Sequence, residues 1–139
     1  MRFFFITLTL IVFVQCSEQP EHVIASKWAN GTTKKEVVLL AGDSTVQTFY
    51  SSGSIEKIQL YTKGEKSGEW TSYYEDGTRW SEHHYVKGIQ VGAYKTWHPN
   101  GEPFIDGLYN DQGKTVGTWT IKDEEGNILQ SVAGETLNP

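Results

Sequence analysis

The chain has 139 residues, which is enough for one domain, and its formal net charge is −5. An acidic chain without a basic run is poorly suited to phosphate backbones, so the composition disfavours nucleic-acid binding. Cys16 is the single cysteine. An internal disulfide is therefore excluded, and stability must come from packing and hydrogen bonds.

Residues 1–16 have the pattern of an export signal. Arg2 precedes a run over residues 3–14 that is apolar apart from two threonines. The run is shorter than the roughly 20 residues that span a bilayer, and it has the length of a signal-peptide core. We therefore expect residues 1–16 to be a signal peptide that directs the protein to the cell envelope.

Cys16 lies two residues beyond the apolar run, and residues 13–16 resemble the lipobox of bacterial lipoproteins. The favoured interpretation is lipidation of Cys16, and this N-terminal lipid would be the protein's membrane contact. The alternatives are ordinary cleavage near Ser17, which would give a soluble exported protein, and a retained N-terminal anchor. Residues 17–26 are polar and contain Pro20, so we expect a flexible tether there.

From about residue 27 to residue 137, glycines and aromatic residues recur every 24 or 25 positions. Segments rich in Thr, Ser and aromatic residues flank Asp-Gly and Asn-Gly pairs, which is the pattern of β-hairpins. The recurring residues are Gly53, Gly77, Gly101 and Gly126; Gly68, Gly92 and Gly117; and Tyr61, Tyr85 and Tyr109. The spacing predicts an all-β fold, an elongated antiparallel β-meander of ~24-residue hairpin repeats in a single-layer twisted sheet.

Strand alternation assigns the large aromatic residues to two faces. Trp70, Tyr94 and Trp119 follow the Gly-x-aromatic glycines and are expected to stack along one face. Tyr73 and Trp97 are repeat-equivalent and are expected on the other face, where they form the candidate binding face. The structural alternative is that both faces are partly covered.

In the second strand of each unit, the same alternation assigns Trp80 and Phe104 to the face that carries His84 and Leu108. On this interpretation His84 is partly buried. His83, which precedes it, is expected to be a polar surface residue.

No residue pattern predicts a catalytic centre, a metal site or a cofactor site. Adjacent His83 and His84 point to opposite faces of a strand, and no histidine or cysteine spacing matches a known metal site. Glu82 and Asp106 are repeat-equivalent and could be imagined as a catalytic carboxylate pair. Their recurrence favours a simpler role in keeping one face soluble, so we expect a protein that is not an enzyme.

Residues 73–82, Tyr-Tyr-Glu-Asp-Gly-Thr-Arg-Trp-Ser-Glu, resemble the bacterial MORN-like repeat, the unit of proteins of the YwqK antitoxin family. Tyr85, Gly88, Gly92 and Tyr94 continue the resemblance, and residues 97–101, 109 and 117–119 match it again. It covers about residues 49–126, and more weakly 27–48 and 127–134. The resemblance implies an elongated single-layer β-meander and a toxin-neutralising partner, and it names no catalytic or binding residues.

Three functions follow as hypotheses. The first is an exported, non-enzymatic repeat protein that binds an unknown protein partner as a scaffold or as an immunity (antitoxin-like) protein. The alternative is a cell-surface carbohydrate-binding module that uses exposed aromatic residues. A third is a cytoplasmic antitoxin with a misread start, which predicts that the mature protein retains residues 1–16.

Overall fold

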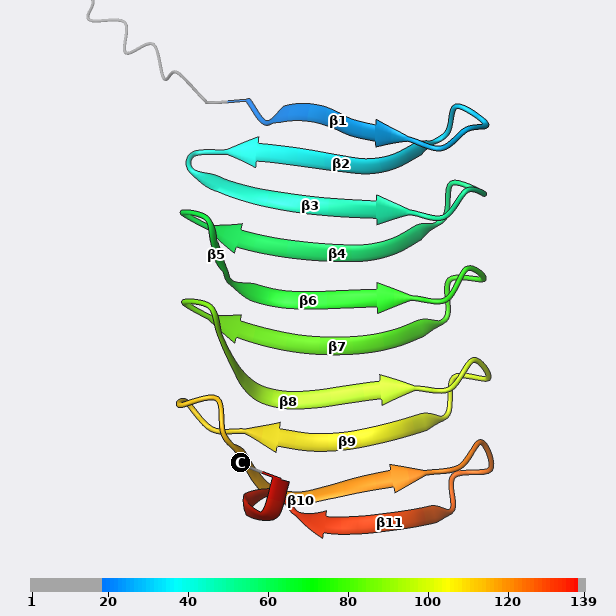
Figure 1. Ribbon diagram of the computed structural model, residues 1–139, viewed down its shortest axis with the longest axis vertical. Coiled ribbons are helices and arrows are strands. Elements are labelled where there is room, and N and C mark those ends of the chain that lie inside the picture. Colours follow the sequence, from blue (N-terminus) through cyan, green and yellow to red (C-terminus); the bar gives the residue numbers. More distant parts are fainter. Residues whose placement is uncertain (1–18, 138–139) are drawn as a thin grey trace, which may run out of the picture.

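The structure is a computed structural model that describes residues 19–137. The predicted signal peptide and Cys16 lie outside the described residues. The described chain forms strands and one short 3-10 helix, η1 (Figure 1). Their bounds are β1 Glu21–Lys27, β2 Thr33–Leu40, β3 Asp43–Phe49, β4 Ile55–Thr62, β5 Glu65–Lys66, β6 Gly68–Tyr73, β7 Arg79–Val86, β8 Ile89–Trp97, β9 Pro103–Tyr109, β10 Thr115–Lys122, β11 Ile128–Ala133 and η1 Gly134–Leu137.

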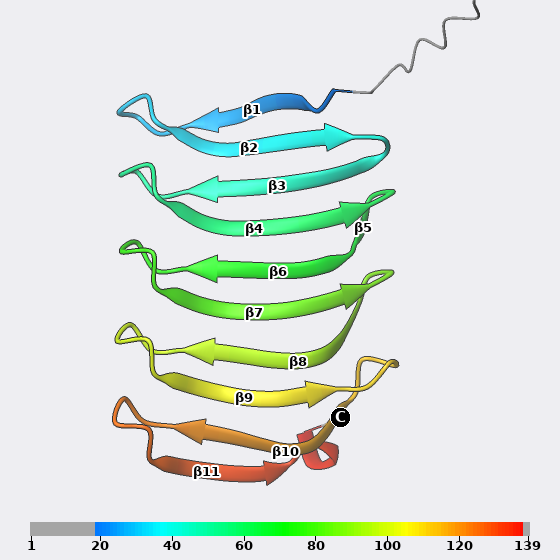
Figure 2. The ribbon, with the colours of Figure 1, turned by 180° about the vertical axis from the view of Figure 1, so that it is seen from behind.

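All strands belong to one open antiparallel sheet. Its spatial order follows the sequence order, and the two-residue strand β5 pairs with β4 beside this path. The two opposite views show one layer of strands with turns along both long sides (Figures 1 and 2). The predicted single-layer β-meander is confirmed, and its outer strands are β1 and β11.

The expected tether is shorter than the sequence indicated, because strand β1 begins at Glu21. Glu21 pairs with Leu39, and Lys27 pairs with Thr33 at the other end of the strand. The polar composition of this segment reflects its place at the edge of the sheet, where every residue of β1 is exposed. This segment is ordered by its pairing with β2, which the local composition does not reveal.

One long side of the sheet carries five long turns, which span residues 28–32, 50–54, 74–78, 98–102 and 123–127. In each, a glycine N–H donates to the carbonyl three residues earlier, as Gly77 does to Tyr74 at 2.9 Å. These glycines have positive φ, for example +89° at Gly77. The predicted glycine turns are therefore confirmed, since residues with a Cβ adopt this conformation at a cost.

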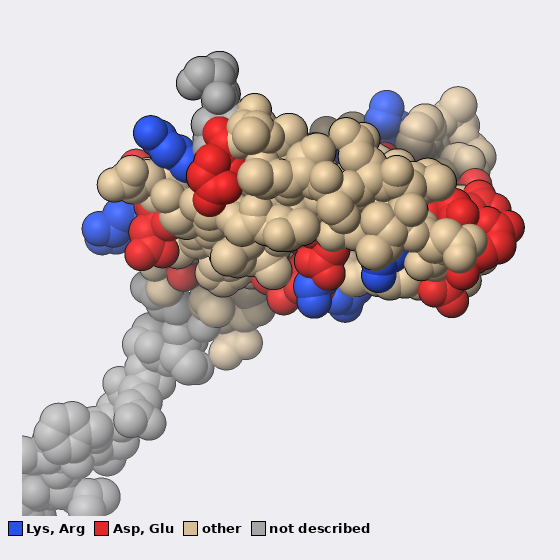
Figure 3. Space-filling model, turned by 90° about the horizontal axis from the view of Figure 1, so that it is seen from below, with Lys and Arg blue, Asp and Glu red and all other residues tan. Residues whose placement is uncertain are grey.

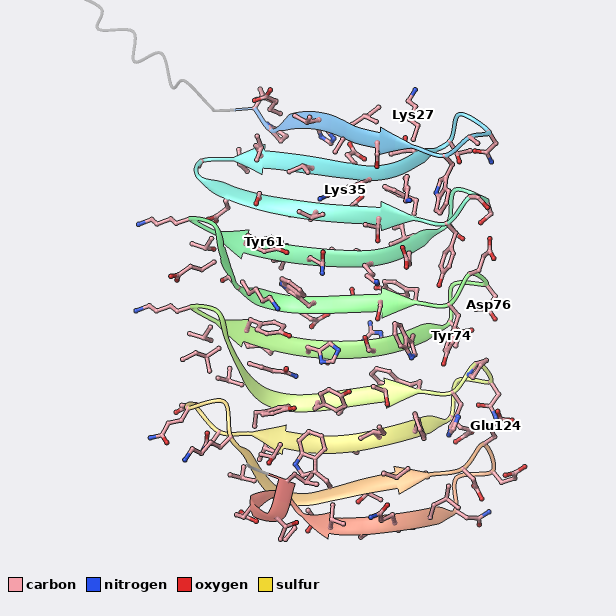
Figure 4. The ribbon with its side chains drawn as sticks, in the orientation of Figure 1. Lys27, Lys35, Tyr61, Tyr74, Asp76 and Glu124 are labelled. Atoms are coloured by element: carbon pink, nitrogen blue, oxygen red, sulfur yellow. The ribbon has the colours of Figure 1, made fainter. Side chains whose placement is uncertain are left out.

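The first residue of each of the first four long turns has an aromatic or imidazole side chain, which hydrogen-bonds to the next repeat unit. Tyr50 Oη donates to the carbonyl of Tyr73 at 2.8 Å, and Tyr74 Oη donates to that of Trp97 at 2.9 Å. Trp28 Nε1 bonds the Phe49 carbonyl at 2.9 Å, and His98 Nε2 donates to the Lys122 carbonyl at 2.9 Å. This hydrogen-bond ladder joins hairpins that would be marginal alone. Figure 4 shows Tyr74 beside the long turns.

Each of the last four repeat units also contains a β-bulge just after its long turn. The pairing passes from Ser72–Ser81 to Tyr73–Arg79, so Trp80 has no partner across the ladder. In the next unit, Phe104 likewise has no partner across the ladder. The other two bulged residues are Glu56 and Leu129. A bulge changes the face to which a residue points.

Candidate binding surfaces of the sheet

The aromatic face of the sheet carries two clusters of rings. Trp70 packs on Tyr61 and Tyr85, with ring centroids 5.1 and 4.9 Å apart. The second cluster contains Tyr94 and Trp119, whose centroids are 5.1 Å apart. Cross-strand pairing places both clusters on the same side of the sheet, as the sequence predicted. Figure 4 labels Tyr61 on this face.

These rings replace the interior of a two-layer fold. Trp119, 8% exposed, is the buried hydrophobic residue of the described chain. It lies over Gly107, where an added Cβ would meet its ring at 2.3 Å. Burial raises the pKa of Tyr94 above its usual value. The two clusters are therefore the packing core of the sheet.

The two adjacent histidines have the reverse of their predicted environments. His83 is half-buried, with its ring centroid 4.9 Å from that of Tyr94 and its Nδ1 3.1 Å from Gln90 Nε2. Burial lowers the pKa of His83; the charge of Glu82 opposes this shift, and nearby Lys66 adds to it. His84 is exposed. It pairs with Val91 on the other face, so the expectation of a partly buried His84 was wrong.

Trp80 and Phe104 do not share a face with His84, contrary to the sequence interpretation. Trp80 packs against Tyr74, with ring centroids 6.4 Å apart, and lines a hollow with His83. Phe104 packs equivalently on His98, at 4.5 Å. The bulges described above are the physical reason, because they shift the alternation by one residue.

The candidate pair Tyr73 and Trp97 lies on the opposite face, where the sequence placed it. Tyr73 pairs with Arg79 next to its long turn. The Arg79 guanidinium lies over the Trp97 ring, 5.7 Å from its centroid, and bonds Glu82. Arg79 therefore lies between the two aromatic residues, and both are half-buried.

Phe49 extends this pair into a row of three, which we call the binding row: Phe49, Tyr73 and Trp97. The three residues end the strands β3, β6 and β8, and each is half-buried. Sequence reasoning missed Phe49 and Arg79. The signal for Phe49 was present in the spacing, because it precedes Tyr73 by one repeat period.

The imagined carboxylate pair is separated by a lysine. Glu82 and Asp106 both pair with Lys95 across the ladder, so the three charges alternate on the opposite face. Alternating opposite charges stabilise neighbouring strands. Among residues 19–137, no three His, Cys, Asp or Glu side chains are grouped in a way that could hold a metal ion. Over the same residues, no helix is long and apolar enough to cross a membrane.

The charged side chains are unevenly distributed between the two long sides of the sheet. Acidic side chains gather at the end that carries the long turns, which lies to the right in Figure 3. Asp76 and Glu124 belong to this end (Figure 4). The short turns opposite contain Lys63 and Lys87, each with positive φ. A hydrogen bond from the Thr78 backbone N–H lowers the pKa of Asp76.

The fold defines an open-sheet repeat protein in which each β-hairpin packs on its sequence neighbours. Residues 66–87 and 90–111 match the MORN repeat variant. The chain thus contains two MORN-like repeats. MORN repeats commonly bind proteins or membranes, and they are not an enzymatic family. No curated protein matches the chain significantly.

Proposed function

We propose that this chain is a non-enzymatic protein of the cell envelope that binds another protein through the binding row. The observation that carries the proposal is the row itself: three half-exposed aromatic residues at one period, with Arg79 between Tyr73 and Trp97. Aromatic residues and arginine are enriched among the residues that dominate protein interfaces.

The single-layer architecture supports this proposal. Both faces of the sheet are open to solvent, and the aromatic face supplies the packing core. The rings of the binding row belong to neither of the two packing clusters. Tyr73 and Trp97 lie beside the long turns, whose acidic residues Glu75 and Asp76 would form a charged rim. A partner with a basic rim around an apolar centre fits this surface.

The direct test is capture of a partner from the native envelope by mild crosslinking. A double variant, Tyr73→Ser with Trp97→Ser, is expected to lose a stoichiometric partner that the unchanged protein retains. Val86→Ser is the matched control, because Val86 is 48% exposed and lies at the other end of the strands. Retention of the partner by a double variant with an unchanged far-ultraviolet circular dichroism spectrum would contradict the proposal.

The envelope location rests on the sequence of residues 1–16 and is tested separately. We expect Cys16→Ala to move the protein from the membrane fraction to the soluble fraction. Mass spectrometry of the unchanged protein should show a diacylglyceryl group on Cys16 as the first residue. A membrane fraction that is the same with Cys16→Ala would refute lipid anchoring. An immunity-like role within this proposal further predicts that the captured partner is toxic when the protein is absent.

A further inference from the structure

We propose that a hollow in the middle of the aromatic face binds one pyranose ring of a neutral carbohydrate. The hollow has a volume of about 230 Å³ and lies over strands β4, β6 and β7. Its floor is formed by Ser72 and Ser81, and its sides by Trp70, Trp80 and His83. It is on the face opposite the binding row, so it is independent of the function proposed above.

The hollow exists because this unit has the smallest side chains on its floor. Ser72 and Ser81 are 5% and 6% exposed, and their hydroxyls bond each other. One period later, Thr96 and Ile105 occupy the equivalent positions and pair in the same way. These side chains are larger than serine and would occupy this depth. The hollow is thus a departure from the repeat at a place where packing alone would favour larger residues.

Trp80 provides the flat apolar wall that a sugar ring needs. Its indole is 45% exposed, although it belongs to the face that carries the core rings. The bulge turns Trp80 toward the hollow. In three other units the equivalent bulged residues are Glu56, Phe104 and Leu129. An amphipathic aromatic ring can cover the C–H face of a pyranose and leave the sugar hydroxyls free to bond polar groups.

The remaining lining groups have hydrogen-bonding capacity suited to hydroxyls. Gln59 offers an amide donor and acceptor, and Lys57 offers a donor. Lys57 Nζ is 3.5 Å from Glu56 Oε1, so the local charge is balanced. A neutral sugar is therefore favoured over an acidic one. The volume is below the roughly 300–1,000 Å³ of pockets for drug-sized ligands, and it suits a single ring.

The test is titration of the mature protein with cellotriose, maltotriose and chitotriose. Tryptophan fluorescence and the indole N–H signals in a ¹H–¹⁵N spectrum report on binding. One small ring in an open hollow predicts a dissociation constant on the order of 1 mM for at least one trisaccharide. The largest shift should come from the Trp80 indole.

The site can be located with substitutions that each introduce a residue found at the equivalent position of another repeat unit. Trp80→Leu takes the residue found at position 129, and it should weaken binding at least tenfold. Ser81→Ile takes the residue found at position 105, and it should fill the hollow and abolish binding. Phe104→Leu is the matched control and should change the affinity less than twofold.

Four outcomes would overturn the proposal. The first is that none of the trisaccharides shifts an indole signal. The second is that Trp80→Leu binds as tightly as the unchanged protein. The third is that Phe104→Leu weakens binding as much as Trp80→Leu, which would show a general effect on the sheet. Ser81→Ile provides a second measurement if Trp80→Leu fails to fold, and unchanged binding to folded Ser81→Ile would also refute the site.

Discussion

Replacing Gly107 with alanine should destabilise the protein, although alanine is ordinarily the better strand residue. Gly107 does not have positive φ, and the equivalent positions hold Gln59, His83 and Val132. The backbone at this position therefore accepts a Cβ. The conflict lies with Trp119, because the added Cβ would be 2.3–2.5 Å from three atoms of the indole. The Trp119 ring must move for the alanine to fit.

The magnitude follows from two opposing effects. At a position without steric conflict, Gly→Ala lowers the entropy of the unfolded chain and stabilises by about 0.4–1 kcal/mol. Overpacking of a well-packed site costs about 1–3 kcal/mol. Trp119 is 8% exposed, and its ring atoms must move by roughly 1 Å to admit the new Cβ. This displacement places Gly107→Ala in the overpacking range. We expect a net loss of about 1–2 kcal/mol and a melting temperature lower by roughly 4–8 °C.

Urea denaturation followed by circular dichroism measures this loss, and a double-mutant cycle assigns it. In a Trp119→Ala background the obstacle is gone, so Gly107→Ala should be neutral or stabilising. The coupling energy should therefore exceed 1 kcal/mol in magnitude. A Gly107→Ala protein as stable as the unchanged one would refute the packing of Trp119 on Gly107. An equal loss in both backgrounds would place the conflict in the backbone.

Three further predictions concern the ladder, a histidine and a turn. Tyr74→Phe removes the hydrogen bond to the Trp97 carbonyl and should cost about 0.5–1.5 kcal/mol in urea denaturation; an unchanged midpoint would contradict the ladder. Because burial lowers the pKa of His83 below the ordinary histidine value of 6.5, its contribution to stability is full above that value and declines as the pH falls through the folded-state pKa. His83→Gln, the residue at the equivalent position 59, should remove this decline in the unfolding free energy measured between pH 7 and pH 5, and an identical pH profile would refute it. Lys87→Asn should stabilise the protein by about 0.5–1 kcal/mol and so raise its melting temperature, because asparagine tolerates the positive φ of 49° at this turn with less strain than lysine. A lower melting temperature would contradict that reasoning.

The turns were predictable because their chemistry is local. Gly53 and Gly77 have φ of +95° and +89°, a conformation that the residue type itself makes accessible. Their spacing sets the length of each hairpin. Gly92 and Gly117 also have positive φ, but they lie within the strands β8 and β10. Those glycines open irregularities in the pairing, and so the repeat glycines do not all belong to turns.

The assignment of residues to faces was only partly predictable. Simple alternation placed Trp70 and Tyr94 correctly and separated them from Tyr73 and Trp97. It placed Trp80 incorrectly, because counting along one strand cannot register a bulge against its partner. The environments of the two histidines were reversed for a related reason. The ring of Tyr94 that covers His83 comes from the neighbouring strand.

The candidate surfaces show the same division. Tyr73 and Trp97 could be proposed from one strand pattern repeated at a fixed period. The hollow could not, because it depends on a bulge at Trp80 and on two serines that come from adjacent strands and bond across them. Nothing in the spacing of Ser72 and Ser81 distinguishes a hollow from a filled site.

The sequence by itself determined the architecture of this protein, since periodic turns and alternating strands act over a few residues and recur. The tertiary structure decided which side chains face one another. It turned Trp80 toward the core rings, buried His83 in place of His84 and ordered residues 21–26 as part of an edge strand. The physical reason is the register between strands, which is set by pairing partners and is absent from any single segment of the chain.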